Sequence, residues 1–153
     1  MADPIRMRRD LTADFPEPSW PDGVAPVLFS ETMAEELHGL LKAGYAKGEG
    51  EVPGFDSWWA ALGADPEYDA ELMLVAQASN GALVALAHCR NSAFLKDLVV
   101  MPGWRRQGIG EALMLRTFEA CRNRYHKTLD LKVLPANIAA QRFFRRMGFL
   151  PSG

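Results

Sequence analysis

FLKDLVVMPGWRRQGIGEALMLR, residues 94–116, is the stretch of this chain that decides its fold. Its apolar run from Leu98 to Met101 is typical of a buried strand, and the Pro102-Gly103 pair that follows ends such a strand. Two arginines and two glycines come next, and the sequence then becomes rich in Ala, Leu, Met and Glu, which favour a helix. The stretch therefore predicts a strand, a basic glycine-rich turn and the start of a helix.

The basic turn has the properties of an anion-binding site. The first backbone N–H groups of a helix have no intrahelical partner, and the helix dipole adds partial positive charge there. Gly108 and Gly110 let a large anion approach the backbone closely, and Arg105 and Arg106 supply forked donors. We expect the turn to hold a pyrophosphate, rather than to be an ordinary helix start with a solvated basic face. A nucleotide P-loop is disfavoured, because no Gly-Lys-Ser or Gly-Lys-Thr follows the glycines.

The overall composition is typical of one soluble domain. With 153 residues, a hydrophobic fraction of 48% and a charged fraction of 24%, the chain can build one core and is too short for two ordinary domains. Its net charge of −2 argues against general nucleic-acid binding. No apolar run approaches the roughly 20 residues of a membrane span and no signal peptide is apparent, so we expect a cytoplasmic protein. Cys89 and Cys121 are expected to be buried free thiols, because their spacing fits neither a metal site nor a Cys-x-x-Cys motif.

Hydrophobic periodicity and turn residues predict a mixed sheet with helices on both faces. Residues 1–21, which are proline-rich, are predicted to form an extended arm, and residues 22–153 the folded domain. Asn80-Gly81 is the strongest turn signal and predicts a hairpin. The other predicted elements are a strand at 24–29, a helix capped by Ser30, a turn-rich loop at 48–54, a helix at 55–62, hairpin strands at 72–78 and 82–90, a strand ending at Met101, a helix at 108–124, a strand at 129–134, a helix at 136–147 and a short final strand.

The chain resembles the GNAT superfamily of acyl-CoA-dependent N-acyltransferases. The pyrophosphate loop of that family is Arg/Gln-x-x-Gly-x-Gly/Ala, and here it is Arg105-Arg106-Gln107-Gly108-Ile109-Gly110. The second signature of the family is an Asn, an Ala three residues later, an aromatic pair and Gly-Phe, which here are Asn137, Ala140, Phe143-Phe144 and Gly148-Phe149. The predicted order of elements is also that of the family, so the resemblance extends from about residue 22 to the C-terminus.

The resemblance implies an α/β (α+β) fold with a mixed, mostly antiparallel sheet whose strands splay at the acyl-CoA site. It also implies acetyl-CoA, or another acyl-CoA, as cosubstrate and no metal. The pyrophosphate would bind the N–H groups of Gln107, Gly108, Ile109 and Gly110, with Arg105 and Arg106 nearby. The pantetheine would lie along Leu98, Val99 and Val100, where backbone pairing would polarise the thioester carbonyl. Asn137 would contact the pantetheine, and the last helix, which carries Phe144, would flank it.

The activity that the resemblance implies is transfer of an acetyl group to a primary amine by direct attack in a ternary complex. The amine would belong to a small molecule or a peptide. A base must take its proton, and the candidates are Asp97 and His88. The alternatives are a structural carboxylate bonded to neighbouring backbone and a half-buried structural histidine. Four aromatic residues lie where the family lines its acceptor pocket, or else form core: Tyr45, Phe55, Trp58 and Trp59.

Two features depart from the family pattern. Phe144 stands where many members have a tyrosine that protonates the leaving thiolate, so a non-catalytic acyl-CoA-binding or sensor protein is the alternative function. The chain also ends at Gly153, where the family usually has one or two further strands. A truncated sequence, a partner chain in a homodimer, or the N-terminal arm covering the exposed sheet edge would each account for that.

Overall fold

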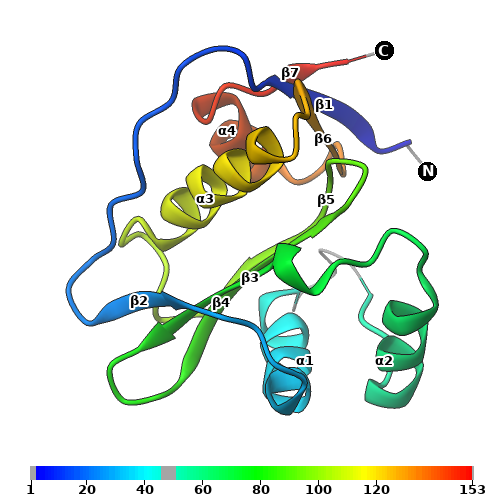
Figure 1. The fold of residues 1–153 in the computed structure, drawn as a ribbon, viewed down its shortest axis with the longest axis vertical. Helices are drawn as coiled ribbons and strands as arrows, with labels where there is room; N and C mark the ends of the chain where they lie inside the picture. The colour runs from blue at the N-terminus through cyan, green and yellow to red at the C-terminus, as the bar shows by residue number, and fades with distance from the viewer. Residues whose placement is uncertain (1–2, 46–50, 153) are drawn as a thin grey trace.

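The computed structural model describes residues 3–45 and 51–152, in which seven strands form one sheet in the order β2-β3-β4-β5-β6-β1-β7 (Figure 1). Neighbouring strands are antiparallel, except that β5 and β6 are parallel. The strands are β1 (Ile5–Asp10), β2 (Val24–Val27), β3 (Met73–Ala78), β4 (Leu83–Arg90), β5 (Phe94–Val100), β6 (Thr128–Val133) and β7 (Leu150–Pro151). The helices are α1 (Ala34–Gly44), α2 (Phe55–Ala64), α3 (Ile109–Asn123) and α4 (Ile138–Arg146), with short 3₁₀ turns at Glu31–Met33 and Ala70–Leu72.

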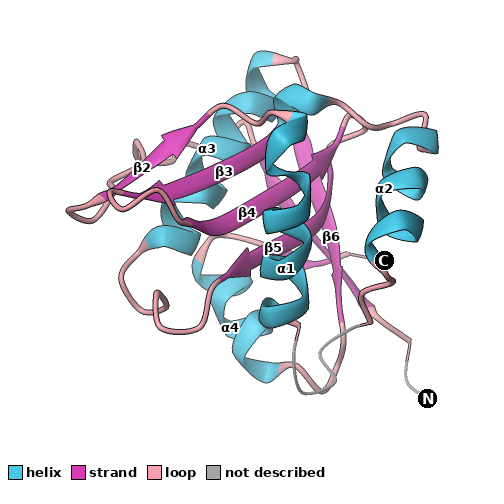
Figure 2. Ribbon diagram, turned by 90° about the horizontal axis from the view of Figure 1, so that it is seen from below, coloured by secondary structure: helices cyan, strands magenta, loops and turns pink. Residues whose placement is uncertain are grey.

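Helices cover both faces of the sheet, and each face has its own apolar core (Figure 2). On one face, α3 buries Leu113 and Phe118 against strands β3, β4 and β5, and α4 adds Phe144. On the other face, α1 and α2 bury Leu37, Leu40, Trp58 and Leu62 against β3, β4 and β5. The predicted fold class, a mixed and mostly antiparallel sheet between two helical layers, is confirmed.

Most of the predicted elements have the predicted type. The Asn80-Gly81 hairpin joins β3 to β4, and β2, which contains Pro26, is an edge strand. α1 begins at Ala34 rather than directly after Ser30, because the 3₁₀ turn Glu31–Met33 stands between them. The Ser30 hydroxyl bonds to Thr32 and caps no helical N–H. The predicted loop at 48–54 lies partly outside the described residues.

The prediction that the first strand starts near Val24 is wrong, because the N-terminal segment contributes β1 to the sheet. β1 pairs antiparallel with β6 from Ile5↔Val133 to Asp10↔Thr128 and also pairs with β7. Asp130 on β6 accepts hydrogen bonds from the guanidinium groups of both Arg6 and Arg8 on β1, at distances from 2.6 to 3.0 Å. The N-terminal segment thus covers the edge of β6, which is one of the three explanations offered above for the missing C-terminal strands. A homodimer stays a prediction.

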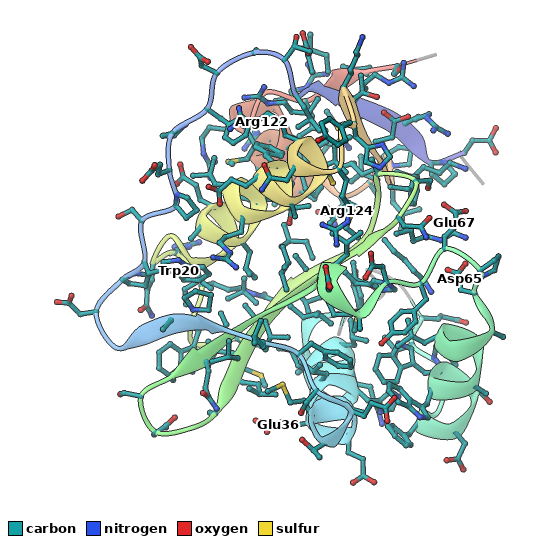
Figure 3. All side chains as sticks on the ribbon, viewed as in Figure 1. Trp20, Glu36, Asp65, Glu67, Arg122 and Arg124 are labelled. Carbon is teal, nitrogen blue, oxygen red and sulfur yellow. The ribbon has the colours of Figure 1, made fainter. Side chains whose placement is uncertain are left out.

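The rest of the N-terminal segment packs along α3 (Figures 1 and 3). Phe15 and Trp20 are partly buried against the α3 core. The Phe15 ring lies edge-on to the Phe118 ring, at 5.3 Å between centroids. The Arg122 guanidinium lies 4.2 Å from the Phe15 ring centroid. Residues 11–23 therefore form part of the folded unit, held to it through Phe15 and Trp20.

Two further expectations concern cysteines and membranes. Cys89 and Cys121 are buried and free, as predicted, and their sulfur atoms lie 3.6 Å apart between β4 and α3. Within residues 3–45 and 51–152, no helix is both long enough and apolar enough to cross a membrane.

The ion pairs of β1 predict a pH-dependent contribution to stability. The hydrogen bonds from Arg8 hold the pKa of Asp130 below its usual value, against the opposing effect of burial, and Arg6 adds to the lowering. A lowered folded pKa means that the carboxylate stabilises the fold above its unfolded pKa of about 4, and that this contribution is lost as the pH falls through the folded pKa.

We expect Asp130→Asn to lower the free energy of unfolding by about 1 kcal/mol near neutral pH, since both guanidinium groups are half exposed. Urea unfolding of both proteins as a function of pH measures this difference. It should shrink as the pH falls below about 4. A difference that persists in acid would assign the effect to packing and not to charge.

Candidate functional site

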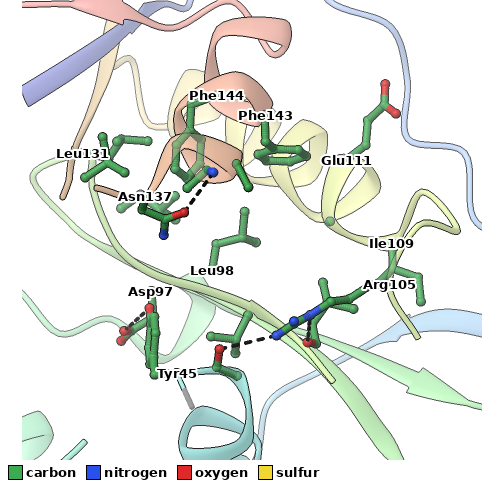
Figure 4. A pocket seen from close by; sticks show the side chains of 18 of the residues that line it. Tyr45, Asp97, Leu98, Arg105, Ile109, Glu111, Leu131, Asn137, Phe143 and Phe144 are labelled. Atoms are coloured by element: carbon green, nitrogen blue, oxygen red, sulfur yellow. Dashed lines mark hydrogen bonds between the residues drawn. The ribbon is translucent and has the colours of Figure 1, made fainter. Parts of the chain in front are cut away.

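A large cavity lies where β5 and β6 separate (Figure 4). These parallel strands pair only at Phe94↔Asp130 and Leu95↔Leu131, and beyond those positions they diverge. A cavity of about 950 Å³ opens between them, lined by residues 95–100 of β5, residues 131–133 of β6, the turn before α3, and α4. All donor-binding residues predicted from sequence except Gln107 line it, which brings residues from distant parts of the chain into one site.

The glycine-rich turn closes one end of the cavity with an uncapped helix. Gly108 is the N-cap of α3 at φ 86°, and no side chain caps this helix end. A Cβ at Gly108 would meet no atom within 4 Å, so the glycine is required by its left-handed backbone and not by crowding. Arg106 also has a left-handed φ of 65°, which costs an L-residue roughly 1–2 kcal/mol. Such strain at an exposed basic turn is typical of a functional site.

The two arginines of the turn have different surroundings. Arg105 donates from Nε to the carbonyl of Val100 at 3.1 Å and from Nη2 to the carbonyl of Gly44 at 3.4 Å. It therefore ties the turn to β5 and to the end of α1, which is a structural use of a predicted ligand-binding residue. Arg106 is exposed at the cavity.

The start of α4 forms the opposite wall. Asn137 is the N-cap of α4 and accepts a hydrogen bond from the Ala140 N–H at 3.1 Å, so its side-chain oxygen is engaged in the helix cap. Phe143 reaches across to α3, where its ring would lie 3.7 Å from a Cβ placed on Gly110. Phe144 is buried, 5.4 Å from Phe143 and 5.6 Å from Phe149 between ring centroids. These contacts fix α4 relative to α3 on either side of the cavity.

The two base candidates, Asp97 and His88, lie opposite each other on β5 and β4. The Asp97 carboxylate accepts a hydrogen bond from the Tyr45 hydroxyl at 2.9 Å, and its second oxygen lies 3.8 Å from His88 Nδ1. Asp97 lines the cavity, whereas the His88 side chain is 2% exposed and does not. His88 Nε2 is buried without a hydrogen-bond partner among the described residues. Asp97 is thus the candidate that can meet a substrate, and His88 stands behind it.

Gly44, the last residue of α1, explains how Tyr45 reaches Asp97. A Cβ on Gly44 would lie 2.8 Å from the Cβ and Cγ1 atoms of Val99, so only glycine lets this helix end approach β5. The next residue, Tyr45, then projects over Asp97 (Figure 4). Sequence analysis had placed Tyr45 in the acceptor region without linking it to Asp97, and it had not selected Gly44 for close packing. The only local signal was a glycine beside a tyrosine at the end of a helix.

Glu51 and Lys132 also line the cavity, and sequence analysis selected neither of them. Glu51 lies in the connection between α1 and α2, and Lys132 is an exposed residue of β6. Among the described side chains, no three His, Cys, Asp or Glu residues lie together as a metal site would require.

Comparison with known proteins agrees with this geometry. The model of the acetyltransferase (GNAT) family matches residues 6–149. Streptothricin acetyltransferase of Streptomyces lavendulae is 35% identical over 92 residues, which are 57% of this chain and 49% of that protein. The chain therefore spans about half the length of this relative.

Solved structures show the same fold. A GCN5-related N-acetyltransferase from Sphaerobacter thermophilus superposes with a TM-score of 0.84 at 22% identity, over 97% of this chain and 48% of that one. The enzyme AAC(6')-Iy, in complex with the bisubstrate analog CoA-S-monomethyl-acetylneamine, superposes with a TM-score of 0.66 at 17% identity, over 85% of this chain and 92% of that one.

The close approach of α1 to β5 predicts opposite effects for two substitutions in one helix. Gly44→Ala should lower the free energy of unfolding by about 1–3 kcal/mol, because the new methyl group must displace Val99. Gly39→Ala is the matched control: nothing lies within 4 Å of its Cβ position, so it should raise stability by about 0.5–1 kcal/mol. Urea denaturation measures both values, and a stabilising Gly44→Ala would refute the steric argument.

Proposed function

The chain belongs to the GNAT acetyltransferase family, and on that premise we propose that it transfers an acetyl group from acetyl-CoA to a primary amine by direct attack in a ternary complex. The observation that carries the proposal is the cavity between the separated strands β5 and β6. The basic, uncapped start of α3 lies at one end of this cavity, and Asp97 of β5 lines it. A cosubstrate with an anionic end and an acyl end fits such a cavity, and no metal is required.

The pyrophosphate of the donor fits the turn before α3. The N–H groups from Gln107 to Gly110 precede the first helical bond there, which Ala112 donates to Gly108. Together with the α3 dipole and the exposed Arg106, they offer the donors that a phosphate needs. The pantetheine would lie along Leu98, Val99 and Val100, whose backbone has no β6 partner among the described residues. An N–H group of that edge would polarise the thioester carbonyl.

Asp97 is the proposed general base. The amine nitrogen must be neutral to bond to the carbonyl carbon, and the Asp97 carboxylate lies at the cavity to take its proton. The hydrogen bond from Tyr45 holds one carboxylate oxygen, and the second oxygen, 3.8 Å from His88 Nδ1, would take the proton. As the carbon–sulfur bond breaks, the electron pair leaves on sulfur. Phe144 has no proton to give, so the thiolate leaves as the anion or takes a proton from solvent.

A small molecule or a peptide is the proposed source of the amine. The relatives named above include a streptothricin acetyltransferase and AAC(6')-Iy in complex with CoA-S-monomethyl-acetylneamine, and these names favour a small-molecule acceptor. Such a molecule would enter beside Tyr45, which bonds to Asp97, and Glu51 lines the same cavity.

A non-catalytic acyl-CoA-binding protein is the second candidate, and Phe144 is the observation that favours it. Release of free thiol from acetyl-CoA across a panel of amines, with a parallel measurement of CoA affinity, separates the two. Tight CoA binding without turnover on any amine would favour the binding protein.

The phosphate assignment predicts that Gly108→Asp weakens CoA binding. A carboxylate at the α3 N-terminus would repel the pyrophosphate, so the Kd for CoA in calorimetry should rise at least tenfold, or about 1.4 kcal/mol. Gly81→Asp is the control, since Gly81 also has a positive φ, of 93°, and open space around it, but lies in the β3–β4 hairpin. Equal CoA affinities for the two variants would mean that the turn does not bind the phosphates.

The base assignment predicts that Asp97→Asn lowers kcat by roughly 10²–10⁴ with little change in the KM for acetyl-CoA, because only proton transfer is lost. Tyr45→Phe should have a smaller effect, since it removes only the hydrogen bond that orients the carboxylate. Initial rates of thiol release measure both. If His88→Gln abolishes turnover while Asp97→Asn keeps it, then His88 is the base and Asp97 its support.

A further inference from the structure

A second cavity, of about 600 Å³, lies beside the first and is rich in basic residues. It is lined by side chains of β1, β5 and β6, among them Arg6, Arg8, Phe94, Thr128, Asp130 and Lys132. Lys132 lines both cavities, so the two are neighbours at the point where β5 and β6 separate.

The basic residues share one face of the sheet with Asp97. Along β6, Leu131 belongs to the α3 core, so its neighbours Asp130 and Lys132 point to the opposite face. Along β1, Met7 belongs to the same core, which puts Arg6 and Arg8 on the face of Asp130. Asp97 lies on this face too, because Tyr45 at the end of α1 bonds to it. A molecule whose amine meets Asp97 can therefore extend across to these cations.

Arg6 and Arg8 are held in place but are not saturated. Asp130, whose side chain is 9% exposed, receives two N–H groups from each guanidinium, while the arginine side chains are 43% and 48% exposed. A guanidinium has five N–H donors, so each arginine keeps three of them. Asp130 thus fixes two forked donors on the face of the sheet without using all of their hydrogen-bonding capacity.

Lys132 adds a charge that the sheet itself disfavours. It lies directly opposite Arg6 in the antiparallel pair of β1 and β6, and like charges in that position are destabilising. No ion pair of Lys132 is found among the described residues. Three cations surround the single carboxylate Asp130, which leaves a net charge of +2 on this cluster. A conflict between local charge and fold is expected where a ligand supplies the missing counter-charge.

Arg90, at the far side of the second cavity, is already neutralised. It donates to Asp65 at 2.8 and 2.9 Å and lies 3.0 Å from Glu67. The hydrogen bonds from Arg90 lower the pKa of Asp65 to about 2, so this carboxylate stays charged at neutral pH. The uncompensated charge is therefore confined to Arg6, Arg8 and Lys132.

We infer that the cluster of Arg6, Arg8 and Lys132 binds an anionic oxygen group, a carboxylate or a phosphate, of the acceptor whose amine is acetylated. This inference rests on the proposed function. β1 lies two strands from β5, which is at least about 10 Å, because β5 and β6 separate beyond Leu95. The anionic group is therefore several bonds from the amine, as in an ω-amino acid or a short peptide, and a polycationic acceptor is disfavoured by repulsion.

A matched series of acceptors tests the inference. We would measure kcat/KM by thiol release for an ω-amino acid with a six-carbon chain, its primary amide, the aminoalkyl phosphate of equal length and the corresponding diamine. The acid or the phosphate should exceed the amide by about tenfold or more, because each forms charge-assisted hydrogen bonds with the arginines. The comparison of acid and phosphate identifies the group. Equal values for acid and amide, or a preference for the diamine, would overturn the inference.

The substitution Lys132→Gln tests whether the cluster causes the preference for the anionic acceptor. It should lower the ratio of kcat/KM for the anionic acceptor to kcat/KM for its amide about tenfold. Its melting temperature should not fall, since the substitution removes a like-charge pair; a purely structural lysine would show the reverse. Lys42→Gln, on an exposed residue of α1 that lines neither cavity, is the control. An equal loss for acid and amide would contradict the assignment.

The same measurements separate this inference from the proposed function. If the amide and the acid are acetylated with equal kcat/KM, the proposed activity is supported and the anion site is refuted. If no amine is acetylated, calorimetry with the CoA-bound protein still decides: binding of the acid but not of its amide supports the site, and binding of neither refutes it.

Discussion

The separation of β5 from β6 is the constraint on which the rest of the structure depends. A parallel pair that stops after Leu95↔Leu131 leaves backbone N–H and C=O groups without partners inside the sheet. Buried backbone groups need partners, so the opening is stable only if solvent or a bound chain-like molecule supplies them. The surrounding elements keep the strands apart: Phe143 of α4 reaches to Gly110 of α3, and Arg105 ties the turn to β5 and to α1.

What could be predicted from sequence is the part of the structure that local chemistry determines. A strand, a Pro-Gly stop and a glycine-rich basic turn specify where α3 begins, and Gly108 has the left-handed backbone that only glycine adopts freely. Asn80-Gly81 specifies a hairpin for the same kind of reason. Asn137 was selected as a ligand contact, and the structure adds its role as the cap of α4. These residues act within a few positions of themselves, so the sequence pattern carries the information.

What could not be predicted depends on partners far away in the sequence. Ile5–Asp10 alternates apolar and charged residues only as far as Arg8 and then continues with Arg9 and Asp10, next to a proline-rich segment. Only Asp130 of β6 reveals that it is a strand. Gly44 is indistinguishable from a helix-ending glycine until Val99 is placed 2.8 Å from its Cβ position. Lys132 looks like an ordinary exposed strand residue until Arg6 is placed opposite it. In each case the meaning of the residue comes from strand pairing or packing, which a single sequence does not display.

The position of β1 between β6 and β7 has a consequence for folding kinetics. The contacts that hold it, Arg6 and Arg8 with Asp130, join residues 124 and 122 positions apart. Contacts of such high sequence separation carry a large loop-closure entropy and form slowly. Until they form, one edge of β6 is unpaired in a chain whose β3, β4 and β5 can already pair through short-range hairpins, and an exposed edge of that kind recruits other chains. We therefore expect the pairing of β1 with β6, beside the proposed acceptor site, to be the folding step that protects the chain from aggregation.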